Sequence, residues 1–193
     1  DRASPRAAHL AVDHICRACD AVPDITGQSA ANAIVSAQAG QTVYICPGTY
    51  FGVQWSPGDF LFGGPITVIG AGDGAGGTVL SGRVRTPPSG TTLRGLQISG
   101  AAQGVSLEGG GVTLIDCTVR DNQIGVLNVG GTVEMQRCNV VSNTSGGINN
   151  VGGAITLRNS TVEQNTATQG AGISSESAPG AGLYASLNLH DSK

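Results

Sequence analysis

The sequence predicts an all-β protein, a parallel β-helix (β-solenoid) in which coils of about 21–22 residues are stacked on one another. Three observations predict this fold. A segment of the chain recurs at that spacing, apolar and polar residues alternate inside each copy, and glycine is abundant while charge is scarce. Of the 193 residues, 31 are glycine, 12% are charged and 4% are aromatic. Such low charge argues against a disordered chain, and collagen is excluded because there is no Gly-X-Y period.

The recurring segment is clearest from residue 91 onward. Three copies align: Leu114-Ile-Asp-Cys-Thr-Val-Arg-Asp-Asn122, Met135-Gln-Arg-Cys-Asn-Val-Val-Ser-Asn143 and Leu157-Arg-Asn-Ser-Thr-Val-Glu-Gln-Asn165. A weaker copy begins at Leu93, so the four copies start 21, 21 and 22 residues apart. Alternation of apolar residues indicates half-buried strands. Three short strands per coil would stack each column of residues on itself, with coils about 4.8 Å apart.

The chain before these copies fits the same fold. Residues 1–27 are expected to form an N-terminal extension, and residues 28–193 a single β-helix domain. The segment from Ser29 to Gly40 predicts a short amphipathic helix, stopped by glycine, that caps the first coil. Residues 42–50 predict a strand and a turn.

A glycine-rich motif follows at residues 66–82. Gly72, Gly74 and Gly77 spell G-x-G-x-x-G after an apolar run, as in a dinucleotide-binding turn. That turn must open a helix, whereas Gly77 is followed by the β-type run Thr78-Val-Leu-Ser-Gly82. The segment therefore predicts two strands joined by a sharp glycine-rich corner.

The recurring pattern L-x-x-[CS]-x-V-x-x-N, followed by G-[VI], resembles the generic repeat of right-handed parallel β-helices, the pectate-lyase-like superfamily. The opening, a capping helix and then Val43-Tyr-Ile-Cys-Pro-Gly-Thr-Tyr50, is similar to that family as well. The resemblance spans about residues 28–175 and implies a right-handed β-helix. Gly152-Gly-Ala-Ile155 and the V-x-x-N runs resemble, more weakly, the repeats of polymorphic membrane proteins, which are autotransporter adhesins.

Two columns of the predicted solenoid are polar or sulfur-containing. Asn122, Asn143 and Asn165 form one column at a corner, where stacked amides can donate to carbonyl groups that a tight turn leaves unpaired. This column is interpreted as a structural asparagine ladder.

A second column consists of Cys117, Cys138 and Ser160. Adjacent coils place the Cα atoms of the two cysteines within disulfide reach. Stacked side chains point alike and not toward each other, so the sequence favours two small buried thiols.

The outer face after the G-[VI] signature is where catalytic β-helices carry acids and bases. If Val126 and Ile148 point inward, the outward column is uncharged; its residues are Ser106, Leu127, Asn149 and Ser174. Asp116 and Arg137 lie on neighbouring coils of another column and are interpreted as a surface ion pair. We therefore predict no catalytic residue, no metal and no cofactor.

The N-terminal cysteines leave two interpretations. Cys16, Cys19 and Cys46, with His14, supply four zinc-type ligands, but the second C-x-x-C or His pair of a zinc site is missing. Alternatively, a disulfide from Cys16 or Cys19 to Cys46 pins the N-terminal segment onto the first coil. Disulfide bonding would indicate an oxidising compartment.

Aromatic residues gather early in the chain, and Tyr50, Phe51 and Trp55 also have two interpretations. Aromatic rings stack on sugar faces, which predicts a glycan contact. Large rings can equally plug the N-terminal end of the solenoid, where an open coil is a sheet edge.

These observations favour a secreted or cell-surface, non-catalytic β-helix that acts as a structural or adhesive module and self-assembles. The alternative is a carbohydrate-active enzyme, a lyase, epimerase or hydrolase on acidic polysaccharide, which rests on fold analogy. A net charge of −3 gives no footprint for nucleic acid, and no apolar run reaches the roughly 18–20 residues of a membrane span.

The spacing changes after the fourth copy. The segment that matches Leu157 next begins at Leu189, a step of 32 residues. Residues past about 183 are therefore expected to begin a new coil that meets another copy of the chain or further coils of a longer precursor. Surface glycans are the other expected partner.

Overall fold

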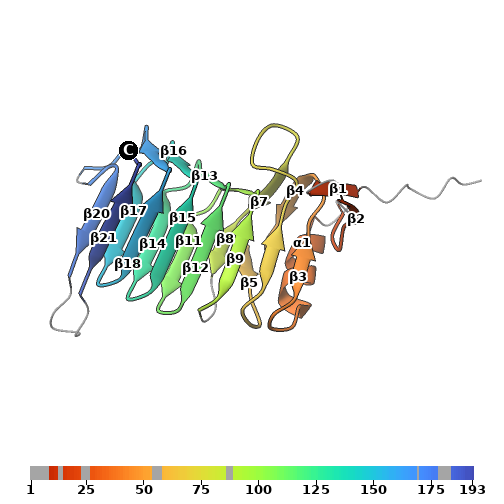
Figure 1. Cartoon of the computed structure of the whole chain (residues 1–193). Helices are drawn as coiled ribbons and strands as arrows, with labels where there is room; N and C mark the ends of the chain where they lie inside the picture. Colours follow the sequence, from red (N-terminus) through yellow and green to blue (C-terminus); the bar gives the residue numbers. More distant parts are fainter. Residues whose placement is uncertain are drawn as a thin grey trace, which may run out of the picture.

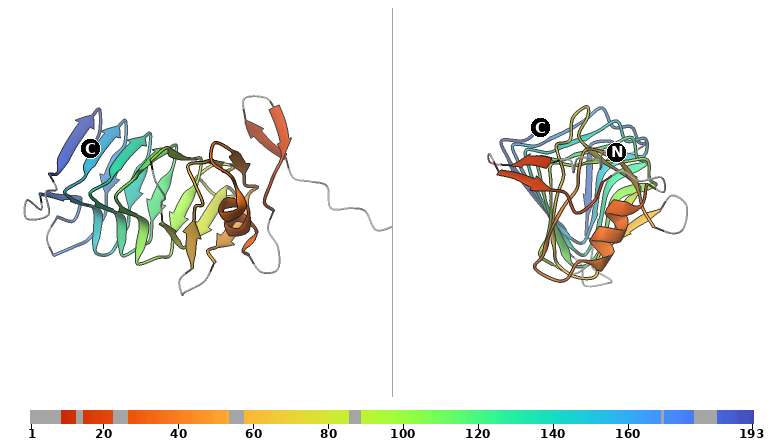
Figure 2. Two further views of the ribbon diagram at one scale, coloured as in Figure 1. Left: turned by 90° about the horizontal axis from the view of Figure 1, so that it is seen from below. Right: turned by 90° about the vertical axis from the view of Figure 1, so that its right-hand side faces the viewer.

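The computed structural model describes residues 9–12, 15–22, 27–53, 58–85, 89–168, 170–177 and 184–193. It is a parallel β-helix, as predicted, in which three sheets run along the solenoid axis (Figure 1). Viewed along the axis, the sheets form the sides of a roughly triangular section (Figure 2). Each coil contributes one strand to each sheet, so every strand pairs with its equivalent in the neighbouring coil.

Sheet A has seven strands: β3 (Thr42–Tyr44), β6 (Thr67–Ile69), β9 (Thr91–Arg94), β12 (Gly111–Ile115), β15 (Thr132–Gln136), β18 (Ala154–Arg158) and β21 (Ser186–His190). Sheet B has six: β4 (Gly48–Phe51), β7 (Thr78–Ser81), β10 (Gln97–Ser99), β13 (Thr118–Arg120), β16 (Asn139–Val141) and β19 (Thr161–Glu163). Sheet C also has six: β5 (Asp59–Leu61), β8 (Arg83–Arg85), β11 (Gln103–Glu108), β14 (Ile124–Val129), β17 (Gly146–Val151) and β20 (Ile173–Glu176).

The remaining elements lie at the N-terminal end. A two-stranded antiparallel hairpin, β1 (His9–Val12) and β2 (Ile15–Ala18), precedes α1 (Ser29–Ser36), the one helix among the described residues, which covers the first coil (Figure 2). The helix ends before Gly40, which lies instead in a turn with a positive φ of 82° and donates its N–H to Pro65 O. Its buried residues Ala30, Ala31 and Ile34 join the core.

The register between coils confirms the predicted repeat. Leu93, Leu114, Met135 and Leu157 are stacked in sheet A, and Leu189 follows Leu157 across the step of 32 residues. The first four are buried and point into the solenoid. The glycine-rich segment joins β6 directly to β7 without a helix, as predicted.

The predicted asparagine column lies at the corner between sheets B and C. Asn122, Asn143 and Asn165 are stacked, and each side-chain Oδ1 accepts a hydrogen bond from the backbone of the preceding coil, at 3.0–3.1 Å. The Nδ2 groups of Asn143 and Asn165 donate to Val119 O and Val140 O, at 3.2 and 2.9 Å. These amides satisfy backbone groups that the corner removes from the sheets.

A second asparagine column was missed by the sequence analysis. Asn128 and Asn150 are fully buried in sheet C, and Asn128 Nδ2 donates to Asn150 Oδ1 at 2.9 Å. Each also donates to the carbonyl three residues ahead, Gly131 O and Gly153 O. The N-x-x-G spacing is visible in only two copies, which is why no repeat signal revealed it.

The glycine of the G-[VI] pattern is required by the first asparagine column. A Cβ at Gly125 would lie 2.8 Å from Asn143 Nδ2, 2.6 Å from Gly147 O and 2.7 Å from Val140 Cγ1. Gly104 and Gly147 meet Asn122 and Asn165 in the same way. The asparagine amide can therefore occupy the corner only if the facing residue is glycine.

Replacing Asn143 with leucine is expected to destabilise the fold by about 1–3 kcal/mol, because carbonyl and N–H groups of two coils lose their partner in a buried corner. Urea unfolding measures this change. Asn139→Leu is the matched control, because Asn139 is exposed on β16 and its loss should change stability by less than about 0.5 kcal/mol. Equal effects of the two substitutions would contradict the ladder.

Substitution of glycine by alanine is expected to reduce stability at a corner glycine and to have little effect at a loop glycine. Gly125→Ala is expected to lower stability by about 1–3 kcal/mol through overpacking against buried backbone. Gly74→Ala is the control, because a Cβ there meets no atom within 4 Å. The midpoint of thermal unfolding measures the effect. An equal midpoint for Gly125→Ala and the unsubstituted chain would contradict the prediction, because it would mean that the corner accommodates the added methyl group.

Candidate functional site

Two outward columns, one in sheet C and one in sheet A, carry mostly uncharged side chains. In sheet C, the predicted column is in register; Arg85 precedes its residues Ser106, Leu127, Asn149 and Ser174. In sheet A, one outward column has a hydroxyl in most coils; it consists of Thr42, Thr67, Thr92, Thr113, Glu134, Thr156 and Asn188. The second outward column of sheet A includes Arg94, Arg158 and His190. None of these columns contains both an acid and a base.

Seven of the described charged side chains form ion pairs between adjacent coils; they are Asp59, Arg83, Arg85, Arg94, Glu108, Asp116 and Arg137. Arg83 on β8 makes a two-pronged contact with Asp59 on β5, with Nε–Oδ1 and NH2–Oδ2 distances of 2.9 and 2.6 Å. The Asp59 carboxylate is largely buried, and this hydrogen bond raises the pKa of Arg83. The pair therefore joins two coils with fixed geometry.

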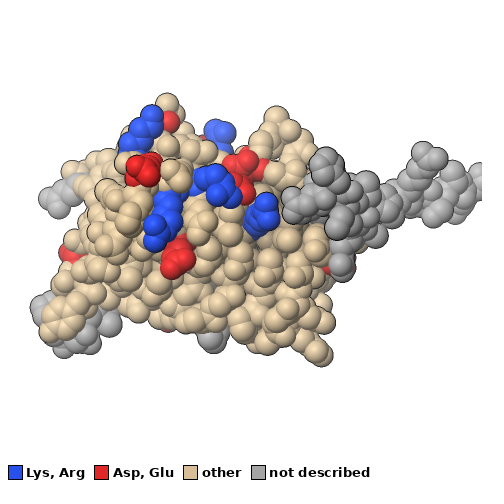
Figure 3. Space-filling view, viewed as in Figure 1, with Lys and Arg blue, Asp and Glu red and all other residues tan. Residues whose placement is uncertain are grey.

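The predicted contact between Asp116 and Arg137 is present in the structure. Arg137 Nε and NH2 lie 2.6 and 3.0 Å from the two carboxylate oxygens of Asp116, and Arg94 approaches from the opposite coil at 3.6 Å. The hydrogen bond from Arg137 lowers the pKa of Asp116, so this carboxyl is held ionised and is not suited to act as a general acid. Charged atoms gather along the upper margin of the visible face, above a nearly uncharged surface (Figure 3).

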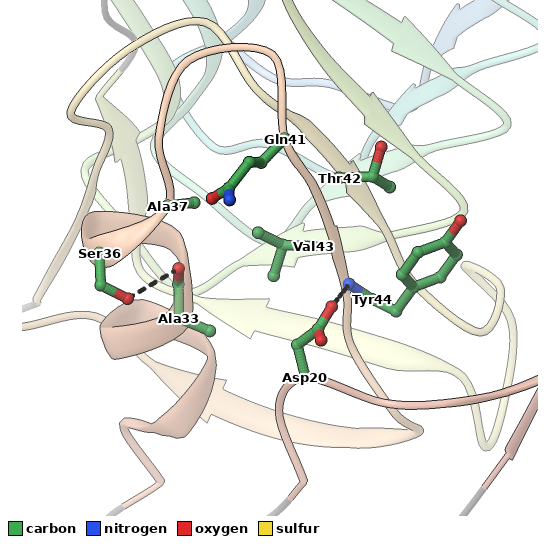
Figure 4. Close-up of a pocket in the computed structure, with 8 residues that line it drawn as sticks. All are labelled: Asp20, Ala33, Ser36, Ala37, Gln41, Thr42, Val43 and Tyr44. Atoms are coloured by element: carbon green, nitrogen blue, oxygen red, sulfur yellow. Dashed lines mark hydrogen bonds between the residues drawn. The ribbon is translucent and has the colours of Figure 1, made fainter.

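A concavity lies at the N-terminal end, between α1 and the edge strand β3. This groove has a volume of about 640 Å³; its lining residues are Asp20, Ala33, Ser36, Ala37, Gln41, Thr42, Val43 and Tyr44 (Figure 4). On its floor, the backbone N–H of Tyr44 donates to Asp20 Oδ2 at 2.8 Å. The groove thus exposes part of a sheet edge and not a set of catalytic groups.

Residues 19–21 cover the other part of that edge, and we name them the guard segment. Ala21 pairs in parallel with Ile45, and the N–H groups of Asp20 and Ala21 both donate to Tyr44 O, at 2.8 and 3.2 Å. A disulfide between Cys19 and Cys46 fixes the segment, with 5.5 Å between the Cα atoms. Of the two predicted partners for Cys46, the structure selects Cys19.

The zinc interpretation does not fit this arrangement, because the disulfide removes two of its four ligands. His14 lies outside the described residues, and Cys16 lies in β2. Among the side chains that the structure describes, no three His, Cys, Asp or Glu come together as a metal site.

The predicted glycan contact at Tyr50 is wrong. Its ring is fully buried in the first coil, and its hydroxyl donates to Cys46 O at 3.0 Å, so no sugar can reach it. The ring plugs the N-terminal end of the core together with the buried Phe60. Phe51 is 51% exposed, and Trp55 lies outside the described residues.

The column of Cys117, Cys138 and Ser160 lies buried behind the corner between sheets A and B. Both cysteines are free thiols. Their Sγ atoms approach the carbonyls of Ile115 and Gln136 at 3.2 and 3.3 Å, and Ser160 Oγ makes the equivalent contact with Arg158 O at 2.9 Å. Burial raises the pKa of Cys117 well above its usual value, which keeps that thiol neutral and unreactive.

Comparison of the chain with protein families, with curated proteins and with solved structures gives no match. Within the described part of the chain, no helix combines the length and the apolar character needed to cross a bilayer.

The two classes of cysteine are expected to differ under denaturing, non-reducing conditions. A thiol reagent should label Cys117 and Cys138, whereas Cys19 and Cys46 should remain linked, because only the second pair is oxidised. Mass spectrometry of the digested chain reports both results. A Cys117–Cys138 crosslink, or a labelled Cys46, would contradict the assignment.

Proposed function

We propose that the chain is a secreted or cell-surface β-helix that acts as a structural and adhesive module without catalysing a reaction. The observation that supports this proposal best is that acidic side chains form ion pairs with arginines of adjacent coils. Asp59, Asp116 and Glu108 each face an arginine of an adjacent coil, at 2.6 to 3.8 Å. Side chains committed to holding coils together are not available to bind or activate a substrate.

Two further features support the same function. The Cys19–Cys46 disulfide is typical of proteins that fold in an oxidising compartment, as secreted and surface proteins do. One outward column of sheet A presents hydroxyl groups in most coils, which suits contact with surface glycans or other neutral polymers.

The competing function is that of a carbohydrate-active enzyme on acidic polysaccharide. A lyase needs a base that removes the proton next to the carboxylate of its sugar substrate. It also needs a cation that neutralises this substrate carboxylate. In the described part of the chain, the acidic side chains that form ion pairs are neutralised by arginine. The groove beside β3 has one carboxylate, that of Asp20, and it accepts a hydrogen bond from the backbone. Fold analogy alone favours this function.

A turnover screen distinguishes the two functions. The purified chain is incubated with polygalacturonate and with alginate, with and without Ca²⁺, and absorbance of unsaturated product is followed over hours. We expect no increase above a chain-free blank, while a known polysaccharide lyase serves as positive control. Sustained product formation, lost on heat denaturation, would overturn the non-catalytic proposal.

A further inference from the structure

Among the described strands, sheet A ends at two edges at opposite ends of the solenoid. Strand β3 is its first strand and β21 its last, and all seven strands are parallel. If a second copy approaches end to end, its β3 edge therefore meets the β21 edge of the first copy with the same strand direction. This inference rests on the proposed structural function and adds to it a surface for self-assembly and the control of that surface.

The β3 edge presents the backbone groups of two residues. Gln41 O accepts from Thr67 N, and Ile45 N donates to Ile69 O, so alternate residues of this strand bond to β6. The N–H and C=O groups of Thr42 and Tyr44 consequently point away from the sheet. Thr42 is one of the residues that line the groove beside α1 (Figure 4).

The β21 edge is complementary. Ser186 N donates to Gly153 O, and His190 O accepts from Asn159 N, so the backbones of Leu187 and Leu189 point to the free side. The side chains of these two leucines continue the core columns of Ile155 and Leu157. They are nevertheless 38% and 51% exposed, because no coil covers β21 among the described strands.

We propose that copies of the chain stack head to tail, with β3 of one copy added in parallel to β21 of the next. In one register Thr42 lies opposite Asn188 and Tyr44 opposite His190. Thr42 N–H then donates to Leu187 O, Leu189 N–H donates to Thr42 O, and Tyr44 N–H donates to Leu189 O. The same register extends the outward column that runs from Thr42 to Asn188 within each copy.

The shapes of the two ends fit this register. Strand β21 stands one coil beyond β19 and β20, the last strands of sheets B and C. At the other end, α1 precedes β3 and packs on β4 and β5 (Figure 1). In the stack, α1 occupies the step beside β21. Lys193 already lies over β19, since its C=O accepts from Val162 N–H, so the 44% exposed Val35 of α1 would cover Ile173, which is only partly buried.

The guard segment competes for the same edge. Asp20 and Ala21 hold the outward N–H and C=O of Tyr44, so only the Thr42 part of β3 is open to a second copy. The Cys19–Cys46 disulfide keeps the segment in place. A dithiol reductant that supplies two electrons and two protons would break this S–S bond, leave a thiol on each cysteine and free the segment to move away. Stacking is therefore restrained in the oxidised chain and favoured in the reduced chain.

Sedimentation velocity over a range of chain concentrations tests the proposal. In the presence of a dithiol, Cys19→Ser is expected to form longer species at a concentration about tenfold or more below that needed by the oxidised chain, because two or three hydrogen bonds of Tyr44 are released. Cys117→Ser, kept oxidised without dithiol, is the matched control, because it removes a buried thiol and leaves the Cys19–Cys46 disulfide in place. Far-UV circular dichroism verifies that each variant is folded.

Two edge variants, made in the Cys19→Ser background, identify the surface. Thr42→Pro removes an N–H that points away from β6, a change that edge strands tolerate, and Leu189→Lys places a charge where Val43 of the next copy would stack. Both are expected to restore a single slow-sedimenting species. If Cys19→Ser does not fold, the native chain reduced by dithiol replaces it.

Three results would overturn the proposal. The unpinned chain could sediment at one rate at every concentration, it could assemble equally well with either edge variant, or the oxidised and reduced chains could assemble alike. Because the readout is size and not turnover, failure here is distinguishable from product formation in the polysaccharide screen.

Discussion

Coil-to-coil register is the constraint on which the rest of this structure depends. In a parallel β-helix each residue lies beside its own equivalent, so a polar group or a bulky side chain placed in one coil must be accommodated again in the next. Strands satisfy their backbone within the sheets, but corners do not. Asn122, Asn143 and Asn165 replace the missing partners, and glycine at 104, 125 and 147 leaves room for their amides. The Asn and Gly positions of the repeat are therefore consequences of one packing problem.

The same constraint explains where charge is found. Opposite charges on adjacent coils attract over a short distance, whereas like charges in a column would repel in every coil. Asp116 lies between Arg94 and Arg137, and Asp59 lies against Arg83. These pairs use arginine forks that match a carboxylate in direction as well as in charge. Cohesion between coils accounts for them without a substrate, which is why the proposed function is structural.

The N-terminal end shows how a solenoid controls an edge that its own sheets cannot cover. Tyr50 and Phe60 fill the first coil, α1 lies over sheets B and C, and the guard segment covers part of β3. Among the described strands, sheet A ends at a partly covered edge at β3 and, at the opposite end, at β21. Control of the first edge by a disulfide would link assembly of the chain to its redox surroundings.

The sequence by itself determined the fold class, the repeat and its register, because a step of 21 or 22 residues with alternating burial admits few physical solutions. It also determined the asparagine column, the cysteine column and the glycine-rich corner at residues 72–77, since each follows from local spacing. Tertiary structure alone decided which cysteine pairs with Cys46, because both candidates lie in a segment without a repeat to fix its position. It alone placed Tyr50 inside the core and Phe51 outside it, since the first coil has no earlier copy from which to read the alternation. Asn128 and Asn150 face inward because they lie two residues after Val126 and Ile148 on the same strands. Only the structure showed the partners that make burial of these amides possible, the carbonyl groups of Gly131 and Gly153, because these contacts depend on how the chain turns after each strand.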